Sequence, residues 1–353
     1  MSKLVLLQTV ATDYRKKLFD TLEHNLKDNF ILFAGEYYFE KSVKTDNTIS
    51  YLHKIKNVYF LNRKFLFQFG MWRESLKTEN LIIEMNPRIL SNWVLLLLRK
   101  VLGKRTILWG HAWPRNGKNS RSDQVRQKMR QLGDVIITYT KTQAIELQEK
   151  MPNKKIIFAP NSLYYKDEMF VAANNSIDDI IYVGRLTTLK KPKLLIEAYS
   201  KVINKLPKSA NLIIVGDGEE FDTLKHLIHT RGLEKKVQLL GHIGDYDKLE
   251  KLYRKSLFSV SPGYVGLSIT QSFSFGVPML ISKDENHSPE IEAAKINENS
   301  VFFETDNVEN LAKKILTFYE NKNSWIKKRK EISRQCQENY SIESMAKTFL
   351  DIL

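Results

Sequence analysis

Short runs of apolar residues, rich in Val and Ile, alternate along the whole chain with segments whose apolar positions recur at helical spacing. An uninterrupted apolar run predicts a strand that is buried on both faces, and the alternation of such strands with helices predicts parallel sheets. We therefore expect strands at Lys3–Gln8, Phe30–Ala34, Val58–Leu61, Leu81–Glu84, Thr106–Trp109, Val135–Tyr139, Ile156–Ala159, Ile180–Val183, Leu212–Val215, Val237–Leu240, Leu257–Val260, Met279–Ser282 and Val301–Phe303.

The strands fall into two blocks, and a length of 353 residues fits two domains. A polar stretch with little periodicity, Pro160–Ser176, separates the blocks. We predict two doubly wound Rossmann-like α/β domains, residues 1–165 and 177–340. A last helix at about Ile342–Ile352, within residues 341–353, either stays on the second domain or crosses back to the first, and its periodicity leaves both open.

The composition restricts the class of protein. A single cysteine, Cys336, excludes a disulfide scaffold and a cysteine-based zinc site and favours a reducing compartment. The start of the chain lacks the cleavage site of a secretory leader, and the longest apolar run, Trp93–Leu98, is too short to span a membrane. We expect a cytoplasmic protein whose attachment to the inner face of the cell membrane, if any, is peripheral.

The net charge of +15 lies entirely in the first half of the chain. Residues 1–166 hold 29 Lys and Arg against 14 Asp and Glu, whereas the remainder holds 26 of each. Such asymmetry predicts that the first domain faces an anionic partner: a phosphate-bearing substrate, a membrane surface or a nucleic acid.

The strand-to-helix turns of the second block carry the candidate chemistry, because ligands of such sheets bind beyond the carboxyl ends of the strands. The first turn reads Gly184-Arg185, with Lys190 before the next helix. A glycine there lets a ligand approach the backbone, and two cations suit a diphosphate. Two solvated charges on a turn are an equally acceptable interpretation.

Two further turns follow the same design. Gly216-Asp217 comes after a strand, and Asp217 either caps the next helix or borders a nucleotide. The stretch Gly263-Tyr264-Val265-Gly266-Leu267 leads into another helix, whose first amides would form an anion site.

In this order and spacing, the three turns resemble those of family 4 glycosyltransferases of the GT-B fold, over about Ile180–Phe303. The resemblance implies two Rossmann-like domains that face a central cleft, and a nucleotide-diphosphate sugar as donor. It implies that Arg185 and Lys190 bind the diphosphate together with backbone amides at Gly266 and Leu267. The implied donor-binding residues are Gly184, Arg185, Lys190, Gly216, Asp217, His242, Ile243, Gly263, Val265, Gly266, Leu267 and Gln271.

The chain departs from the family pattern at two positions. Family members usually carry a Glu that contacts the donor sugar and, eight positions later, a Glu that contacts the ribose, where this chain has Gly263 and Gln271. A Gln amide still hydrogen-bonds to hydroxyl groups, whereas glycine offers no side chain. Asp284, Glu285 or Glu290, after the next strand, are alternative sugar contacts.

The first domain resembles the family at particular points. His111 follows a predicted strand where members often carry a histidine beside the donor sugar, and a role in packing or capping is the alternative. Basic residues are candidates for binding an acceptor or a membrane, and solvated or sheet-covering faces are the alternative. These candidates are Arg15, Arg99, Lys100, Arg115, Lys118 and Arg121.

The resemblance implies a retaining glycosyltransferase, and we expect His111, Arg185 and Lys190 to be its catalytic residues. We expect no cofactor and no metal, because Asp245-Tyr246-Asp247 fits a helix cap better than a metal site. From the resemblance and the basic first domain, the expected acceptor is a glycan hydroxyl, on a lipid carrier, in bacterial polysaccharide synthesis such as that of capsule or lipopolysaccharide. The alternatives are a nucleotide-sugar epimerase and a non-enzymatic polyanion binder, although no nucleic-acid motif is present.

Overall fold

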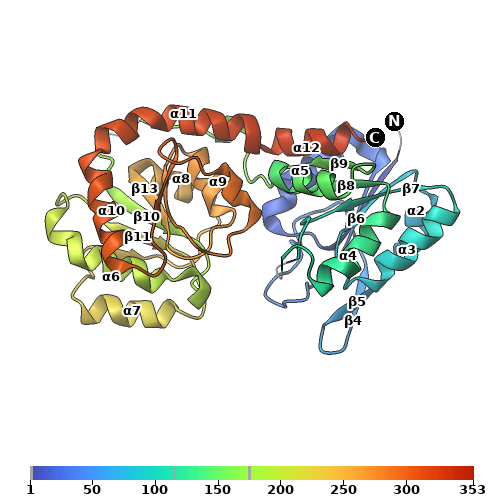
Figure 1. Ribbon diagram of the computed structural model, residues 1–353, viewed down its shortest axis with the longest axis horizontal. Coiled ribbons are helices and arrows are strands. Elements are labelled where there is room, and N and C mark those ends of the chain that lie inside the picture. Colours follow the sequence, from blue (N-terminus) through green and yellow to red (C-terminus); the bar gives the residue numbers. More distant parts are fainter. Residues whose placement is uncertain (1–2, 115–116, 174–175) are drawn as a thin grey trace. The chain divides into compact units, whose positions relative to one another are not determined.

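The computed structural model describes residues 3–114, 117–173 and 176–353. The chain forms two compact units (Figure 1). The first comprises Met1–Leu163 together with Tyr340–Leu353, and the second comprises Tyr164–Asn339. Each unit is built around its own parallel sheet, as the apolar strands predict.

The first unit contains a seven-stranded sheet in the order β3-β2-β1-β6-β7-β8-β9. Its strands pair in parallel throughout. The inner strand β1 is fully buried along its length, which its mostly apolar sequence LVLLQTV explains. The strands are β1 (Leu4–Val10), β2 (Phe30–Gly35), β3 (Leu52–Lys54), β6 (Asn80–Glu84), β7 (Arg105–Trp109), β8 (Val135–Thr138) and β9 (Lys155–Phe158).

Helices cover this sheet, and the last helix of the chain is one of them. Phe349 packs its ring against Trp109 at 4.9 Å between ring centres, and Thr348 donates to the carbonyl oxygen of Phe158 at 3.0 Å. The apolar side of this helix is therefore buried in the first unit. The helices are α1 (Lys16–Leu26), α2 (Trp72–Lys77), α3 (Leu90–Val101), α4 (Arg121–Leu132), α5 (Lys141–Lys150) and α12 (Ile342–Leu350).

The second unit contains a six-stranded parallel sheet in the order β12-β11-β10-β13-β14-β15. Its strands are β10 (Asp179–Val183), β11 (Leu212–Val215), β12 (Val237–Leu239), β13 (Ser256–Ser261), β14 (Met279–Ser282) and β15 (Ser300–Phe303). Its helices are α6 (Pro192–Val202), α7 (Phe221–Thr230), α8 (Tyr246–Lys255), α9 (Ser268–Ser274), α10 (Val308–Glu320) and α11 (Lys322–Tyr340).

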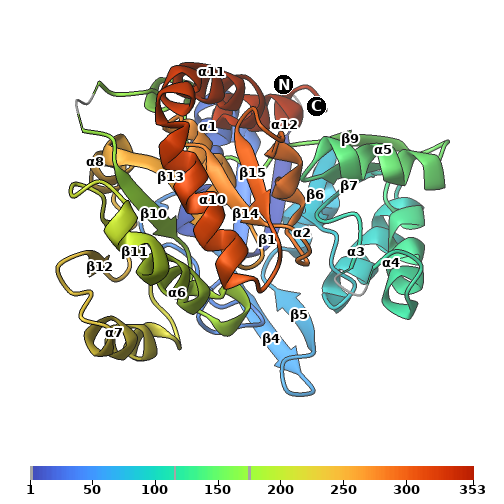
Figure 2. The ribbon, with the colours of Figure 1, turned by 60° about the vertical axis from the view of Figure 1, so that its left-hand side comes forward.

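One strand prediction is wrong in its pairing. The run Val58–Leu61 was expected in a parallel sheet, but β4 (Lys56–Phe60) pairs in antiparallel fashion with β5 (Phe65–Phe69) as a separate hairpin. The hairpin extends away from the sheet of the first unit (Figure 2). An apolar run alone does not specify the partner of a strand, since partner and direction depend on the connection.

Both sheets reverse their strand order beside their first strand. In the first unit the reversal lies between β1 and β6, and in the second between β10 and β13. Because the loops at a reversal leave toward opposite sides, a crevice for ligands forms beyond the carboxyl ends of these strands. The first of the three sequence motifs, Gly184-Arg185, follows β10, and the third, Gly263–Leu267, follows β13.

Candidate donor-binding site

Lys190 and Tyr264 join the first and third motifs. The Lys190 ammonium donates to the carbonyl oxygen of Tyr264 at 2.7 Å and lies 3.6 Å from the centre of the same residue's ring. On the other side, Arg185 Nη2 lies 3.4 Å from Tyr264 Oη. The two cations predicted to bind a diphosphate therefore converge on one residue of the turn after β13. Tyr264 received no role from the sequence, although it stands inside the quoted motif.

Gly263 is a site of close backbone approach. A Cβ atom at this position would lie 2.2 Å from the carbonyl oxygen of Leu189 and 2.8 Å from the carbonyl carbon of Lys190. The short 3-10 helix Thr188–Lys190 therefore presses its backbone against the turn after β13. No side chain fits here, so the carboxylate that resembling proteins carry at this position has no room in this chain.

The environment of Lys190 changes its proton affinity. Burial lowers the pKa of the half-buried Lys190 ammonium to about 8, and the positive charge of Arg185 acts in the same direction. The nearby Glu290 carboxylate partly opposes the shift. An anionic ligand would compensate both unfavourable effects, since it supplies the missing negative charge. The lowered pKa and the convergent cations make this place a candidate site for an anion.

The turn that leads into α9 lies close to this ammonium. A Cβ atom on Gly266 would lie 3.9 Å from Lys190 Nζ. The amides of Ile269 and Gln271 donate to the carbonyl oxygens of Gly266 and Leu267 and so begin the helical hydrogen bonding. The amides of Gly266 and Leu267 precede that pattern, as expected at a helix start. The turn that carries these backbone amides therefore lies next to the Lys190 ammonium.

His287, in the loop after β14, supports the same turn and was missed in the sequence. Its Nδ1 accepts a hydrogen bond from the Val265 amide at 3.0 Å, and its Nε2 lies 2.9 Å from the carbonyl oxygen of Ser282. Because Nδ1 accepts, Nε2 must carry the proton and donate to Ser282. Burial lowers the pKa of His287, which keeps this neutral tautomer. The ring therefore fixes the Val265–Gly266 backbone.

The acidic residues after β14 differ in their surroundings. Glu285 pairs with Lys191 at 2.6 Å, and Lys191 also pairs with Asp306 at 2.6 Å. Asp284 is exposed, whereas Glu290 is buried and close enough to Lys190 to affect its charge. Glu285 is therefore engaged in an ion-pair cluster. Glu290 is buried and acts electrostatically on Lys190, so it is not an exposed carboxylate at the edge of the sheet.

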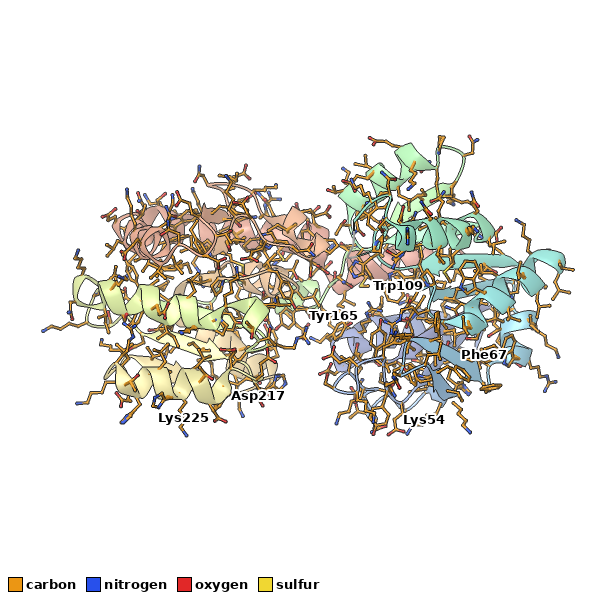
Figure 3. The ribbon with its side chains drawn as sticks, turned by 60° about the horizontal axis from the view of Figure 1, so that its bottom comes forward. Lys54, Phe67, Trp109, Tyr165, Asp217 and Lys225 are labelled. Carbon is orange, nitrogen blue, oxygen red and sulfur yellow. The ribbon has the colours of Figure 1, made fainter. Side chains whose placement is uncertain are left out.

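The turn after β11 contacts the turn after β10. Gly216 has φ +153°, and a Cβ atom there would lie 1.9 Å from the carbonyl oxygen of Gly184. Its amide donates to the carbonyl oxygen of Gly241, which brings the loop of His242 and Ile243 alongside. Asp217 does not cap α7: its side chain accepts from the Gly218 amide at 2.7 Å and is exposed at the end of β11 (Figure 3).

Gln271 is held by two tyrosines. Its Nε2 donates to Tyr164 Oη at 2.9 Å, and Tyr253 Oη lies 3.5 Å from its Oε1. Neither tyrosine was singled out from the sequence. The amide is therefore oriented by the protein, and its role toward a ribose stays a prediction.

The first unit gathers polar side chains at its own sheet reversal. Arg15 donates to Gln8 Oε1 at 3.1 Å and to Tyr139 Oη at 2.8 Å, and its guanidinium lies over the Trp109 ring at 4.3 Å. His111 is exposed after β7, with its ring 4.6 Å from the Tyr139 ring. Arg15 is thus part of the sheet edge rather than of an outer basic face.

The other basic candidates divide by burial. Arg99 is fully buried and donates to carbonyl oxygens of Ser75, Thr78, Glu79 and Arg105, so the prediction that it binds an acceptor or a membrane is wrong. Lys100 and Arg121 are exposed. Lys118 is exposed and pairs with Glu146 at 2.7 Å. Arg115 lies outside the described residues.

The Asp245-Tyr246-Asp247 sequence is a helix cap, as predicted. Asp245 precedes α8, and its carboxylate accepts from the Lys248 amide at 2.9 Å. In the part of the chain that the structure describes, no group of three or more His, Cys, Asp and Glu side chains is arranged to hold a metal ion. None of the described helices is long and apolar enough to cross a membrane.

Comparison with known proteins finds similarity to glycosyltransferases, mainly in the second unit. Residues 168–339 match the family model of glycosyl transferases group 1. An uncharacterized glycosyltransferase of Haemophilus influenzae is 28% identical over 226 residues, which cover 62% of this chain and 61% of that protein. N-acetyl-alpha-D-glucosaminyl L-malate synthase of Bacillus anthracis is 23% identical over 128 residues, 36% of this chain and 32% of that protein. The matched parts thus span less than two thirds of these relatives.

Solved structures resemble the chain over its full length. Anabaena Alr3699/HepE in complex with UDP has a TM-score of 0.72 at 13% identity and covers 100% of this chain and 99% of its own. The pneumococcal O-GlcNAc transferase GtfA in complex with UDP and GlcNAc has a TM-score of 0.73 at 12% identity, with 99% and 98% covered. These likenesses confirm the predicted fold class, GT-B with two Rossmann-like units.

Proposed function

We propose that the protein transfers a sugar from a nucleotide-diphosphate sugar to a hydroxyl group of a glycan acceptor, and the match of residues 168–339 to the family model of glycosyl transferases group 1 supports this proposal. The observation that carries the proposal is the convergence of Lys190 and Arg185 on Tyr264, beside the backbone amides at Gly266 and Leu267.

The arrangement suits the charge that develops during the reaction. Breaking the bond between the sugar and its phosphate leaves a diphosphate as the leaving group, with additional negative charge on its terminal oxygens. Two cations and fixed amide donors stabilise that charge more than they stabilise the bound donor, which lowers the barrier. His287 holds the Val265 amide, so these donors are oriented before the substrate arrives.

The nucleotide of the proposed donor is a uridine diphosphate. HepE and GtfA, which share the fold, are described as complexes with UDP. The loop of His242 and Ile243, which the Gly216 amide holds at Gly241, is the proposed neighbour of the base.

The finer parts of the proposal concern stereochemistry and acceptor. Resemblance to retaining enzymes supports retention of the anomeric configuration, with no covalent nucleophile assigned. The proposed acceptor is a lipid-linked glycan of bacterial polysaccharide synthesis, supported by the net charge of +15 in residues 1–166. His111 is the proposed sugar-positioning residue of the first unit.

The test is a thermal-shift and calorimetric screen of the full chain against UDP and a panel of nucleotide sugars. A ligand that binds the folded state raises the melting temperature. Arg185→Ala should abolish the shift of the best ligand, whereas Lys193→Ala, which removes an exposed charge on α6, should preserve it. An unchanged shift in Arg185→Ala would place the donor elsewhere.

An activity assay then separates the enzyme classes. With donor alone, a transferase should leave the sugar configuration unchanged, whereas an epimerase would convert the donor without an acceptor. A steep loss of heparin or nucleic-acid binding with salt, without any transfer, would instead identify a polyanion binder.

A further inference from the structure

Helix α3 exposes an apolar face to solvent. Six residues on or directly after this helix are exposed: Leu90, Val94, Leu97, Leu98, Val101 and Leu102, with exposed fractions of 38, 37, 54, 43, 86 and 56%. We call these six residues the α3 stripe. Single exposed apolar residues are ordinary on a soluble protein, whereas a contiguous row marks a surface that binds something.

The stripe is a regular feature of the helix. At 3.6 residues per turn, its five helical members fall within an arc of about 100°. The opposite side of α3 carries Asn92, Leu95, Leu96 and Arg99, which are buried against the first unit. One face of the helix is therefore buried in the first unit, whereas the opposite face is apolar and exposed.

Helix α3 and the segments next to it in the sequence carry charge of one sign. The sequence holds no Asp or Glu between Glu84 and Asp123. Lys100 is exposed beside the stripe, about two helical turns after the half-buried Trp93. The indole of Trp93 donates to the carbonyl oxygen of Pro87 at 3.0 Å, and its partly buried ring packs against the core of the first unit. An exposed apolar face beside a Lys is the pattern of a helix that lies in a membrane interface.

The β4–β5 hairpin contacts α3 through β5 and exposes apolar residues of its own. Phe60 and Leu61, at its tip, are 46 and 71% exposed. Arg88, just before α3, donates to the carbonyl oxygens of Lys64 and Arg63 at 2.7 and 2.8 Å and so ties the hairpin loop to the start of the helix. Figure 1 shows the hairpin projecting from the first unit.

Neighbouring α4 adds further charge, since α3 and α4 contact each other. Its exposed side carries Arg121 and Lys128 around Val125, which is itself 48% exposed. Cations therefore lie next to the exposed apolar residues of α3 and α4, and neither helix has an exposed acidic residue.

From these observations we propose that the α3 stripe and the tip of the β4–β5 hairpin dock the protein on the surface of an anionic lipid bilayer. This inference rests on the proposed function in that it gives a lipid-linked acceptor its location. The apolar residues would enter the interface, and Lys100, Arg121 and Lys128 would pair with the negative surface potential. A second copy of the chain is disfavoured as occupant, because pairing two such faces would bring like charges together.

The test measures sedimentation of the full chain with phosphatidylcholine vesicles, with and without about one third phosphatidylglycerol. We expect binding to the anionic vesicles at low salt, weakened at least about tenfold at high salt because exposed charges are screened. Leu97→Gln combined with Val101→Gln should lower the partition coefficient by at least about tenfold, and Lys100→Gln should lower it several-fold.

Matched controls are Ile145→Gln on α5 and Ile296→Gln in the second unit, which are 52 and 69% exposed and should bind like the wild type. Equal vesicle binding by the wild type and the double variant, or no binding by the wild type, would overturn the proposal. So would light scattering that shows a dimer dissociated by the double variant. The double variant should show the same UDP-induced thermal shift as the wild type. If UDP fails to shift the melting temperature of the wild type, that result contradicts the proposed donor and leaves the docking proposal untouched.

Discussion

Lys190 Nζ lies 2.7 Å from the carbonyl oxygen of Tyr264 and 3.6 Å from the centre of its ring, so one residue of the turn after β13 holds the ammonium from two sides. This relationship joins two segments that lie more than seventy residues apart in the chain. It turns two separate sequence motifs into one cationic site.

The ring of Tyr264 should therefore matter more than its hydroxyl group. Tyr264→Ala removes the cation–π contact and should weaken binding of a nucleotide sugar about fivefold, in keeping with roughly 1 kcal/mol for such a contact. Tyr264→Phe keeps the ring and should stay within about twofold of the wild type. Calorimetric titration of both variants measures the difference, and equal losses would show that the ring does not position Lys190.

Restoring a side chain at position 263 should damage the protein. Gly263→Glu places its Cβ atom 2.2 Å from the carbonyl oxygen of Leu189, so the Thr188–Lys190 segment must move. We expect a loss of about 1–3 kcal/mol in stability, as for other overpacked sites, together with loss of nucleotide-sugar binding. Gly244→Ala is the control for stability, because its Cβ would meet only the His242 ring, at 3.4 Å. A stable Gly263→Glu variant with improved donor binding would contradict the steric argument.

Donor binding should weaken as the pH rises above about 8. The free protein has its Lys190 pKa lowered to about 8 by burial and Arg185, and a bound diphosphate raises the pKa again because it stabilises the ammonium form. Affinity is therefore constant below pH 8 and falls by up to about tenfold per pH unit above it. Titration with a nucleotide sugar between pH 6.5 and 9 measures the slope.

Lys190→Arg provides the control for this pH dependence. Arginine stays protonated throughout the range, so the variant should bind with the same affinity at pH 7 and pH 9. A wild-type affinity that does not change with pH, or an equal slope in the arginine variant, would assign the titration to another group.

The ion pair of Asp123 and Arg130 should contribute strongly to the stability of the first unit. Their side chains are 1 and 0% exposed, 2.5 Å apart, and Lys150 binds the other carboxylate oxygen at 2.7 Å. Asp123→Asn leaves Arg130 buried without its counter-charge, so we expect a loss of about 3–5 kcal/mol. Chemical denaturation measures it. Asp20→Asn, in the partly exposed pair with Lys16, should cost less than about 1 kcal/mol, and similar losses in both variants would contradict the argument.

The local pattern of the sequence determined most of the secondary structure. Apolar runs such as Leu4–Val10 and Leu212–Val215 form buried parallel strands. They do so because a strand that is apolar on both sides is stable only when both faces are covered. The positions of the glycine turns followed in the same way, since Gly184 and Gly216 end such strands and allow two backbones to touch.

Only the tertiary structure decided which elements meet. The periodicity of α12 shows an apolar face but not the core that receives it, and the structure places that face against Trp109 in the first unit. Arg99 belongs to a basic stretch, yet carbonyl groups from separate segments surround its guanidinium and bury it. Likewise, Tyr264 and His287 acquire their roles through partners distant in sequence. Periodicity shows which face of each segment is buried. The contacts between residues distant in sequence depend instead on how the segments pack against one another.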